Sequence, residues 1–123
     1  MKIYNFGPDH GEKIDKFNSD FIFSKIIRST AGVKASCFHL GANGLVGFHE
    51  ATTQQLFLVL KGKGWARGRL PNKIPIAENQ AVFWGKNEWH EAGTDTGLVA
   101  IVIEGDFENP SDFMSTDWDG IAN

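Results

Sequence analysis

The sequence has only one cysteine among its 123 residues, Cys37, so an internal disulfide is excluded. A chain without disulfides suits a reducing compartment, and we expect a cytoplasmic protein. No apolar run approaches the roughly 20 residues needed to span a bilayer. The opening residues, MKIYNFGPDHGEKI, contain no apolar core of signal-peptide length. We therefore expect no membrane partner.

The sequence also lacks a large charge of either sign. Its formal net charge is −3, which argues against nucleic acid as the main partner. The segment from 61 to 73 does gather five basic residues without an acid: Lys61, Lys63, Arg67, Arg69 and Lys73. We interpret it as a hairpin with basic residues on its solvent face, the alternative being an anion-binding patch. It lacks the aromatic stacking platform that single-strand binders use.

Helix signals are almost absent, and the one short candidate, HGEKIDKF, is only weakly periodic. The apolar stretches have strand length and are mostly bounded by Gly, Asn, Pro or Asp. They read FIFSKII, VKASCFHL, LFLVL, GWARGRL, AVFW and LVAIVI. The length and a hydrophobic content of 41% fit one globular domain. The sequence therefore predicts a single all-β domain, with an irregular tail over 105–123.

The stretch QLFLVL is apolar on both faces. Phe57 and Val59 point to one side of the strand, and Leu56, Leu58 and Leu60 point to the other. A strand with one face in solvent would alternate with polar residues. We therefore expect one face to line a barrel interior, and the other to be covered by a second sheet or another subunit. The stretch LVAIVI shows the same pattern, and together they favour a homodimer.

Two histidines stand in matching contexts. His49 precedes the LFLVL run, and His90 follows AVFWGKNEW. This arrangement resembles the two sequence motifs of the cupin superfamily, over roughly residues 35–104. In the first motif, His49 takes the first histidine, Ala51 replaces the second, Gln55 replaces the glutamate, and Gly62 takes the final glycine. In the second motif, His90 takes the histidine.

The resemblance implies a jelly-roll β-barrel, also called a double-stranded β-helix, built from two antiparallel sheets with one open end. The whole chain, residues 1–123, is then a single cupin domain. Its motif core is about 35–104, its N-terminal strands lie within 1–34, and its irregular tail covers 105–123. The resemblance also favours a homodimer.

His49, Gln55 and His90 are the residues that the resemblance places at a metal site. Imidazole binds Zn, Mn, Fe and Ni well, whereas an amide adds no charge neutralisation. Glu88 has the same strand parity as His90 and is our reserve acid. Two interpretations stay open. Either His49, Gln55 and His90 hold a divalent transition metal, or they form a metal-free, hydrogen-bonded polar cluster.

Four further residues are candidates for ligand contact. Trp84 and Trp89 flank the second motif, and one of them is expected at the mouth of the pocket, with a stacking face and an N–H donor. His39 joins the site if its face of VKASCFHL lines the barrel. Phe57 completes the set of expected ligand-contacting residues.

Three functions follow as hypotheses. The first is binding of a small polar molecule in the barrel mouth by His49, Gln55, His90 and one tryptophan. The second is a metal-dependent dioxygenase or isomerase, with His49 and His90 on the metal and Gln55 or Glu88 completing its shell. The third is a metal-free epimerase or isomerase with His49 or His90 as general base.

Overall fold

The computed structural model describes residues 1–118, with the side chains of residues 1–116. Its eleven strands are β1 (Lys2–Asn5), β2 (Glu12–Ile14), β3 (Phe21–Phe23), β4 (Val33–Leu40), β5 (Leu45–Glu50), β6 (Gln54–Arg67), β7 (Ile74–Ala77), β8 (Gln80–Trp84), β9 (Trp89–Gly93), β10 (Leu98–Gly105) and β11 (Ser115–Trp118). Three short 3-10 turns cover Pro8–His10, Lys16–Asn18 and Pro110–Asp112. No helix within residues 1–118 has the length and hydrophobicity of a membrane span.

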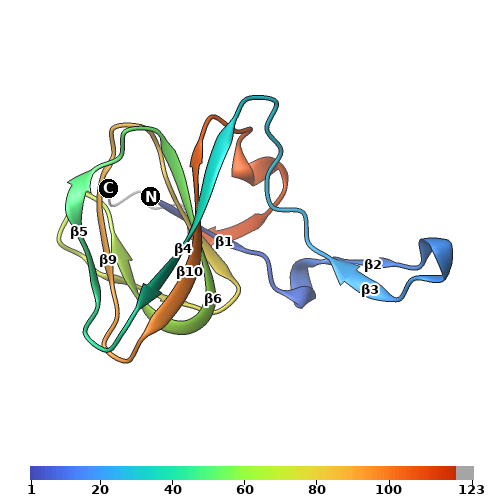
Figure 1. The fold of residues 1–123 in the computed structure, drawn as a ribbon, viewed down its shortest axis with the longest axis horizontal. Coiled ribbons are helices and arrows are strands. Elements are labelled where there is room, and N and C mark those ends of the chain that lie inside the picture. Colours follow the sequence, from blue (N-terminus) through green and yellow to red (C-terminus); the bar gives the residue numbers. More distant parts are fainter. Residues whose placement is uncertain (119–123) are drawn as a thin grey trace.

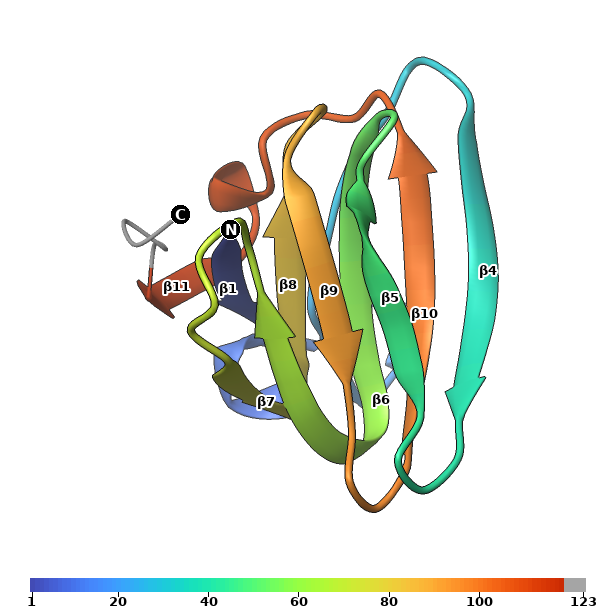
Figure 2. The same ribbon diagram turned by 90° about the vertical axis from the view of Figure 1, so that its left-hand side faces the viewer.

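Ten or fewer residues separate most strands, and every pairing is antiparallel. The larger sheet has the order β11-β1-β8-β6-β10-β4. The smaller sheet is formed by β7, the end of β6, β9 and β5, and Figure 2 looks onto it. The two sheets face each other around one interior, so the predicted all-β barrel of antiparallel strands is confirmed.

Strand β6 connects the two sheets. The sequence suggested two strands, LFLVL and GWARGRL, separated at Gly-Lys-Gly, but the chain continues as one strand of 14 residues. Its pairing with β10 shifts by one residue between Val99 and Ala100, and Gly62 has φ +85°. A Cβ at Gly62 would lie 2.3 Å from the Gly97 carbonyl oxygen. The glycine therefore permits a bend within a strand rather than ending it.

The expected two-sided burial of β6 is confirmed for residues 56–59, but Leu60, which the sequence placed on the covered outer face, is 49% exposed. Phe57 and Val59 belong to the interior cluster, together with Val82, Trp84 and Val102. The opposite face forms a second cluster around six buried residues: Tyr4, Leu56, Leu58, Ala81, Phe107 and Met114.

The cover on this outer face comes from the chain itself, not from a second sheet or another subunit as the sequence suggested. Ile26 and Ile27 pack against it from the N-terminal side. Phe107 and Met114 pack from the C-terminal segment. The pattern of apolar residues showed that cover was needed, but it could not say which segment supplies it.

The tail predicted to be irregular over 105–123 has no regular structure over 106–114 apart from the 3-10 turn Pro110–Asp112, but its residues Ser115–Trp118 form strand β11. Met114 and Pro110 are buried, and β11 pairs with β1. These apolar anchors hold the segment on the barrel, so its backbone completes the edge of the larger sheet. Residues 119–123 lie outside the described part of the chain.

Strands β2 and β3 form a separate two-stranded sheet. This hairpin extends away from the barrel on the side of the larger sheet (Figure 1). We call residues 12–23 the arm. The weak helix signal in HGEKIDKF falls on β2 and the two flanking 3-10 turns, and no α-helix forms there.

Candidate functional site

His49 and His90 lie opposite each other in the smaller sheet. They are register partners on β5 and β9, and their ring centroids are 4.3 Å apart. The pairing shifts between Val46 and His49; Val46 packs against the interior cluster, and the His49 ring contacts the His90 ring. His90 is 1% exposed, whereas His49 is exposed. The histidine pair expected from the motifs is therefore brought together.

Backbone carbonyls orient both imidazole rings. The Nδ1 atom of His49 lies 2.6 Å from the Gly47 carbonyl oxygen, and that of His90 lies 3.3 Å from the Glu88 carbonyl oxygen. A carbonyl only accepts, so Nδ1 carries the hydrogen in each ring and Nε2 keeps a lone pair. Among the described residues, His90 Nε2 is buried without a hydrogen-bond partner.

The environment of His90 favours its neutral form. Burial is the main cause that lowers the pKa of His90, and the nearby His49 lowers it further. The Glu88 carbonyl and the carboxylates of Glu88 and Glu104 oppose this shift without cancelling it. The ring therefore presents a neutral acceptor or metal-ligating nitrogen to the barrel interior.

Trp84 on β8 stacks on His90. Their ring centroids are 4.5 Å apart, with 30° between the planes. Trp84 is 1% exposed, and its Nε1 also lacks a hydrogen-bond partner within the described chain. A buried polar atom left unpaired costs about 1–3 kcal/mol. The stacked pair thus holds one unsatisfied donor and one unsatisfied acceptor.

Gln55 and Glu104 continue the site across the larger sheet. They are register partners on β6 and β10, and Gln55 Nε2 donates to Glu104 Oε1 at 2.7 Å. Glu104 also pairs with Lys34 Nζ on β4 at 3.3 Å. Gln55 lies opposite Trp84 on its other side. We call this set the polar row; it consists of Lys34, Glu104, Gln55, Trp84, His90 and His49.

Glu104 and Lys34 were missed by the sequence analysis. The acid predicted from the sequence, Glu88, is a neighbour of His90 in the chain. The available signal was strand parity, because Leu98, Ala100 and Val102 face the interior and Glu104 continues that face. Extending LVAIVI by one residue would have found this carboxylate.

The structure does not bring His39 to the site. His39 is exposed on β4, while its neighbour Phe38 faces the interior and contacts Phe57 with ring centroids 6.3 Å apart. The condition under which His39 would join the site, that its face of VKASCFHL lines the barrel, is therefore not met. The alternation was read correctly, but nothing in VKASCFHL says which face turns inward.

Trp89 and Phe57 occupy different surroundings from the polar row. Trp89 packs on Phe48, with ring centroids 5.3 Å apart, and Arg67 lies over the same Phe48 ring. Trp89 also lines a surface cavity of about 180 Å³. Phe57 is buried and meets Trp84 edge-on at 6.2 Å, so it packs beneath the site. Of the two tryptophans, Trp84 is the one beside the histidines.

The backbone carbonyl of Glu88 contacts the site more directly than its carboxylate does. The carboxylate binds the amino group of Met1 at 3.0 Å. Its carbonyl accepts from Ala51 N and from the His90 ring. The reserve acid is therefore engaged with another group, although it still acts on His90 electrostatically.

The donor set for a metal is small. Within residues 1–118, no group of three or more His, Cys, Asp and Glu residues is arranged to hold a metal ion. Ala51, at the position of the motif's second histidine, is buried. The donors that fit a metal are the Nε2 atoms of His49 and His90, with the Gln55 amide beside them. The unpaired Nε2 of His90 is the observation that favours this fit.

No family model and no curated protein matches this sequence. Solved structures do match its fold. A cupin superfamily protein from Desulfitobacterium hafniense aligns with a TM-score of 0.56 and 17% identity, over 67% of this chain and 74% of its own. A cupin-2 domain protein from Shewanella frigidimarina gives 0.53 and 17%, over 70% and 85%. This chain has the cupin fold.

A third match is a predicted oxalate decarboxylase from Thermotoga maritima, with a TM-score of 0.50 and 20% identity over 56% of this chain and 62% of its own. These identities support a shared cupin fold and not a shared activity. The resemblance found in the His49 and His90 motifs is thus confirmed as a fold assignment.

Proposed function

We propose that this cupin-fold protein binds a small polar molecule in the barrel interior beside the polar row. The observation that carries the proposal is the stacked pair of Trp84 and His90, with its unpaired N–H donor and unpaired acceptor nitrogen. A hydroxyl group can accept one hydrogen bond and donate another. One ligand hydroxyl would therefore satisfy both buried atoms.

The rest of the row supports a neutral ligand rather than an anion. His90 favours its neutral form, and Glu104 adds a negative charge that is balanced by Lys34. One N–H of the Gln55 amide is donated to Glu104, which leaves its second N–H as a donor and its oxygen as an acceptor. The row thus offers acceptors at Gln55 and the histidines and donors at Trp84 and Gln55, a pattern that suits a hydroxyl-bearing metabolite.

A divalent transition metal is the second candidate. It is favoured by the way both histidines use Nδ1 on a carbonyl and leave Nε2 free, as metal-binding histidines usually do. Zn, Mn, Fe or Ni would be held by His49 and His90, with the Gln55 oxygen as a third donor. The metal would supply Lewis acidity for a dioxygenase or isomerase. Without a metal, either histidine is a candidate general base for an epimerase or isomerase, and Glu88 stays a candidate acid.

Elemental analysis and ligand screening separate these proposals. Untagged protein is purified without chelator and measured for metals beside the His49→Ala/His90→Ala variant. Near-stoichiometric metal that disappears in the variant would establish the metal site. Metal-free protein would instead be screened with neutral polyols and sugars for a rise in melting temperature.

Matched variants make the screen specific. Trp84→Phe and His90→Gln should lose the rise in melting temperature, whereas Trp89→Phe and His39→Gln should keep it. The two controls change the same residue types on outer surfaces of the barrel. A rise in melting temperature that survives Trp84→Phe and His90→Gln would overturn the binding proposal.

A further inference from the structure

A cavity lies at the end of the barrel that is remote from the polar row. Its volume is about 550 Å³, within the range of small-molecule sites. It is lined by the end of β4, the beginning of β10 and the bend of β6, which lie at the lower edge of the barrel in Figure 2. Leu98 lines this cavity and Glu104 belongs to the polar row, and their positions on β10 are about 20 Å apart. The cavity is therefore separate from the site beside His90.

Missing side chains leave this cavity open. Three glycines line it: Gly41 after β4, Gly62 at the bend of β6, and Gly97 before β10. Gly62 and Gly97 have φ +85° and +121°, conformations that residues with a side chain rarely adopt. A Cβ added at Gly41 would meet nothing within 4 Å. The main chain therefore forms part of the cavity wall, and a bound molecule can approach it closely.

The cavity also has an apolar wall. Leu40 and Leu98 are register partners at the ends of β4 and β10, and both pack in or against the interior cluster. Val99, the next residue of β10, lines the cavity beside them. These three side chains offer an apolar contact surface to a bound molecule.

Hydrogen bonds fix the polar wall of the cavity. Gly62 N donates to Glu78 Oε1 at 3.1 Å, which holds the carboxylate of the β7–β8 turn beside the bend of β6. The buried Thr94 hydroxyl accepts from Gly97 N at 2.9 Å and donates to the Lys63 carbonyl oxygen at 2.7 Å. These bonds fix the turn before β10, so the cavity is formed without a ligand.

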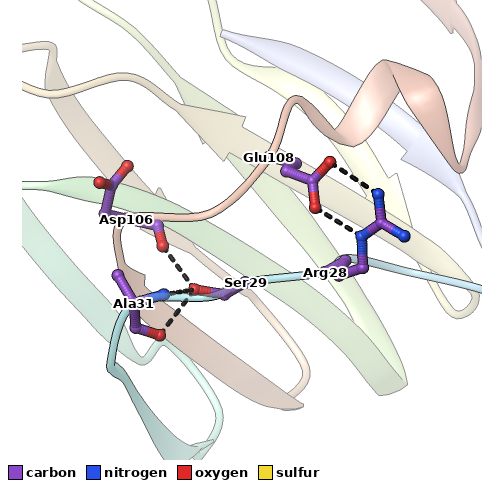
Figure 3. A network of polar contacts seen from close by, with 5 residues as sticks. All are labelled: Arg28, Ser29, Ala31, Asp106 and Glu108. Carbon is purple, nitrogen blue, oxygen red and sulfur yellow. Dashed lines mark hydrogen bonds and ion pairs between the residues drawn. The ribbon is translucent and has the colours of Figure 1, made fainter.

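Opposite charges line this cavity without pairing. Lys61 and Glu78 both line it, and neither forms an ion pair with any residue of the described chain. By contrast, the exposed Arg28 guanidinium makes two hydrogen bonds to the Glu108 carboxylate, at 2.6 and 3.1 Å (Figure 3). The cavity thus keeps one ammonium group and one carboxylate oxygen available to a ligand.

We propose that this cavity binds a zwitterionic amino acid with a large apolar side chain. The ligand carboxylate pairs with the Lys61 ammonium group, and the ligand ammonium group pairs with the second oxygen of Glu78. The ligand side chain packs on Leu40, Leu98 and Val99. A ligand with a single charge would leave one charge of the cavity without a partner, so both ligand charges contribute to specificity.

NMR titration of the wild type with L-phenylalanine tests the proposal. The amide signals of Gly62, Gly97 and Val99 should shift and reach saturation. Hydrocinnamate has the same ring and chain without the ammonium group, and phenethylamine has them without the carboxylate. Each should bind about tenfold more weakly than phenylalanine, because it loses one charge-assisted hydrogen bond. Absence of saturable shifts, or an analogue that binds as tightly as phenylalanine, would overturn the proposal.

Two variants assign the ligand charges to their partners. Lys61→Met and Glu78→Gln should each weaken phenylalanine binding about tenfold. The new amide of Glu78→Gln can still accept from Gly62 N, so the turn is kept. Lys86→Met and Glu12→Gln, the latter on the arm, change the same residue types at exposed positions outside the cavity and should bind like the wild type.

The variants and the analogues together form a double-mutant cycle. Lys61→Met should lose the preference for phenylalanine over phenethylamine, and Glu78→Gln should lose the preference over hydrocinnamate. A variant that retains its tenfold preference would show that the ligand charge lies elsewhere, which overturns the proposal.

His90→Gln separates this proposal from the binding proposed beside the polar row. It should leave phenylalanine binding unchanged, because the two sites lie at opposite ends of β10. Loss of phenylalanine binding in His90→Gln would place the amino acid beside the polar row and overturn the inference drawn for this cavity.

Discussion

The Trp84 indole stacks on the His90 imidazole with ring centroids 4.5 Å apart, and each ring holds a buried nitrogen without a partner in the described chain. The two residues come from β8 and β9, so the stack lies where the larger sheet meets the smaller one. Two unpaired buried atoms of this kind lower the stability of the free protein. A molecule that forms hydrogen bonds with both atoms would recover this free energy on binding.

Trp84→Phe should separate the role of the ring from that of its N–H group. The free protein should lose only about 1 kcal/mol, because no hydrogen bond to the Trp84 N–H group from the described residues is broken. Trp84→Ala should lower the free energy of unfolding by about 3–5 kcal/mol, because it leaves a cavity in the core. Urea unfolding of both variants checks this. Equal losses of stability in Trp84→Phe and Trp84→Ala would mean that the Trp84 N–H group already has a hydrogen-bond partner in the free protein.

His90 should make stability depend on pH in metal-free protein. Its folded pKa is lowered, so below the unfolded value of about 6.5 the unfolded chain takes up a proton more readily than the folded one. The free energy of unfolding should then fall on acidification by up to about 1.4 kcal/mol per pH unit, levelling off below the folded pKa.

Urea unfolding between neutral and mildly acidic pH measures this effect as the difference between the wild type and His90→Gln. His39→Gln should retain the wild-type pH dependence, because His39 is exposed. If the difference in unfolding free energy between the wild type and His90→Gln does not change with pH, burial of His90 is not the cause of the pH dependence.

Gln55→Glu should destabilise the protein near neutral pH, although it restores the acid of the cupin motif. The new carboxylate would face Glu104, which now accepts a hydrogen bond from Gln55 at 2.7 Å. Loss of this bond and the like-charge contact should cost about 1–3 kcal/mol. The penalty should shrink at acidic pH, where one carboxyl is protonated.

The exchange Gln55→Glu/Glu104→Gln should recover most of this stability, since it keeps one amide and one carboxylate at the same pair of positions. Thermal unfolding of the single and double variants forms a double-mutant cycle. An additive cycle would show that the two side chains do not interact.

Gly62→Ala should destabilise the barrel by about 1–3 kcal/mol, because the residue needs a positive φ and has no room for a Cβ. Gly41→Ala is the matched control, since nothing lies within 4 Å of its added Cβ. Denaturant unfolding of the two variants measures the difference. A Gly62→Ala variant as stable as the control would argue against the strand bend described for β6.

Much of the barrel could be predicted from local pattern. The apolar stretches VKASCFHL and LVAIVI coincide with β4 and most of β10, because strand formation there depends on the side chains of the strand itself. Strands β5, β7 and β9 were not found from apolar runs, because polar residues, glycine and proline interrupt them. They are held by pairing with neighbours distant in the sequence.

The site shows the same division. The residue types and spacings around His49 and His90 were sufficient to predict a histidine pair inside a cupin barrel, since a motif is a local property of the chain. Cross-strand register then decided that Gln55 meets Glu104, that Trp84 rather than Trp89 reaches the histidines, and that His39 faces outward. A strand exposes either face equally well until another sheet packs on it, and that choice is made by contacts between segments far apart in the sequence.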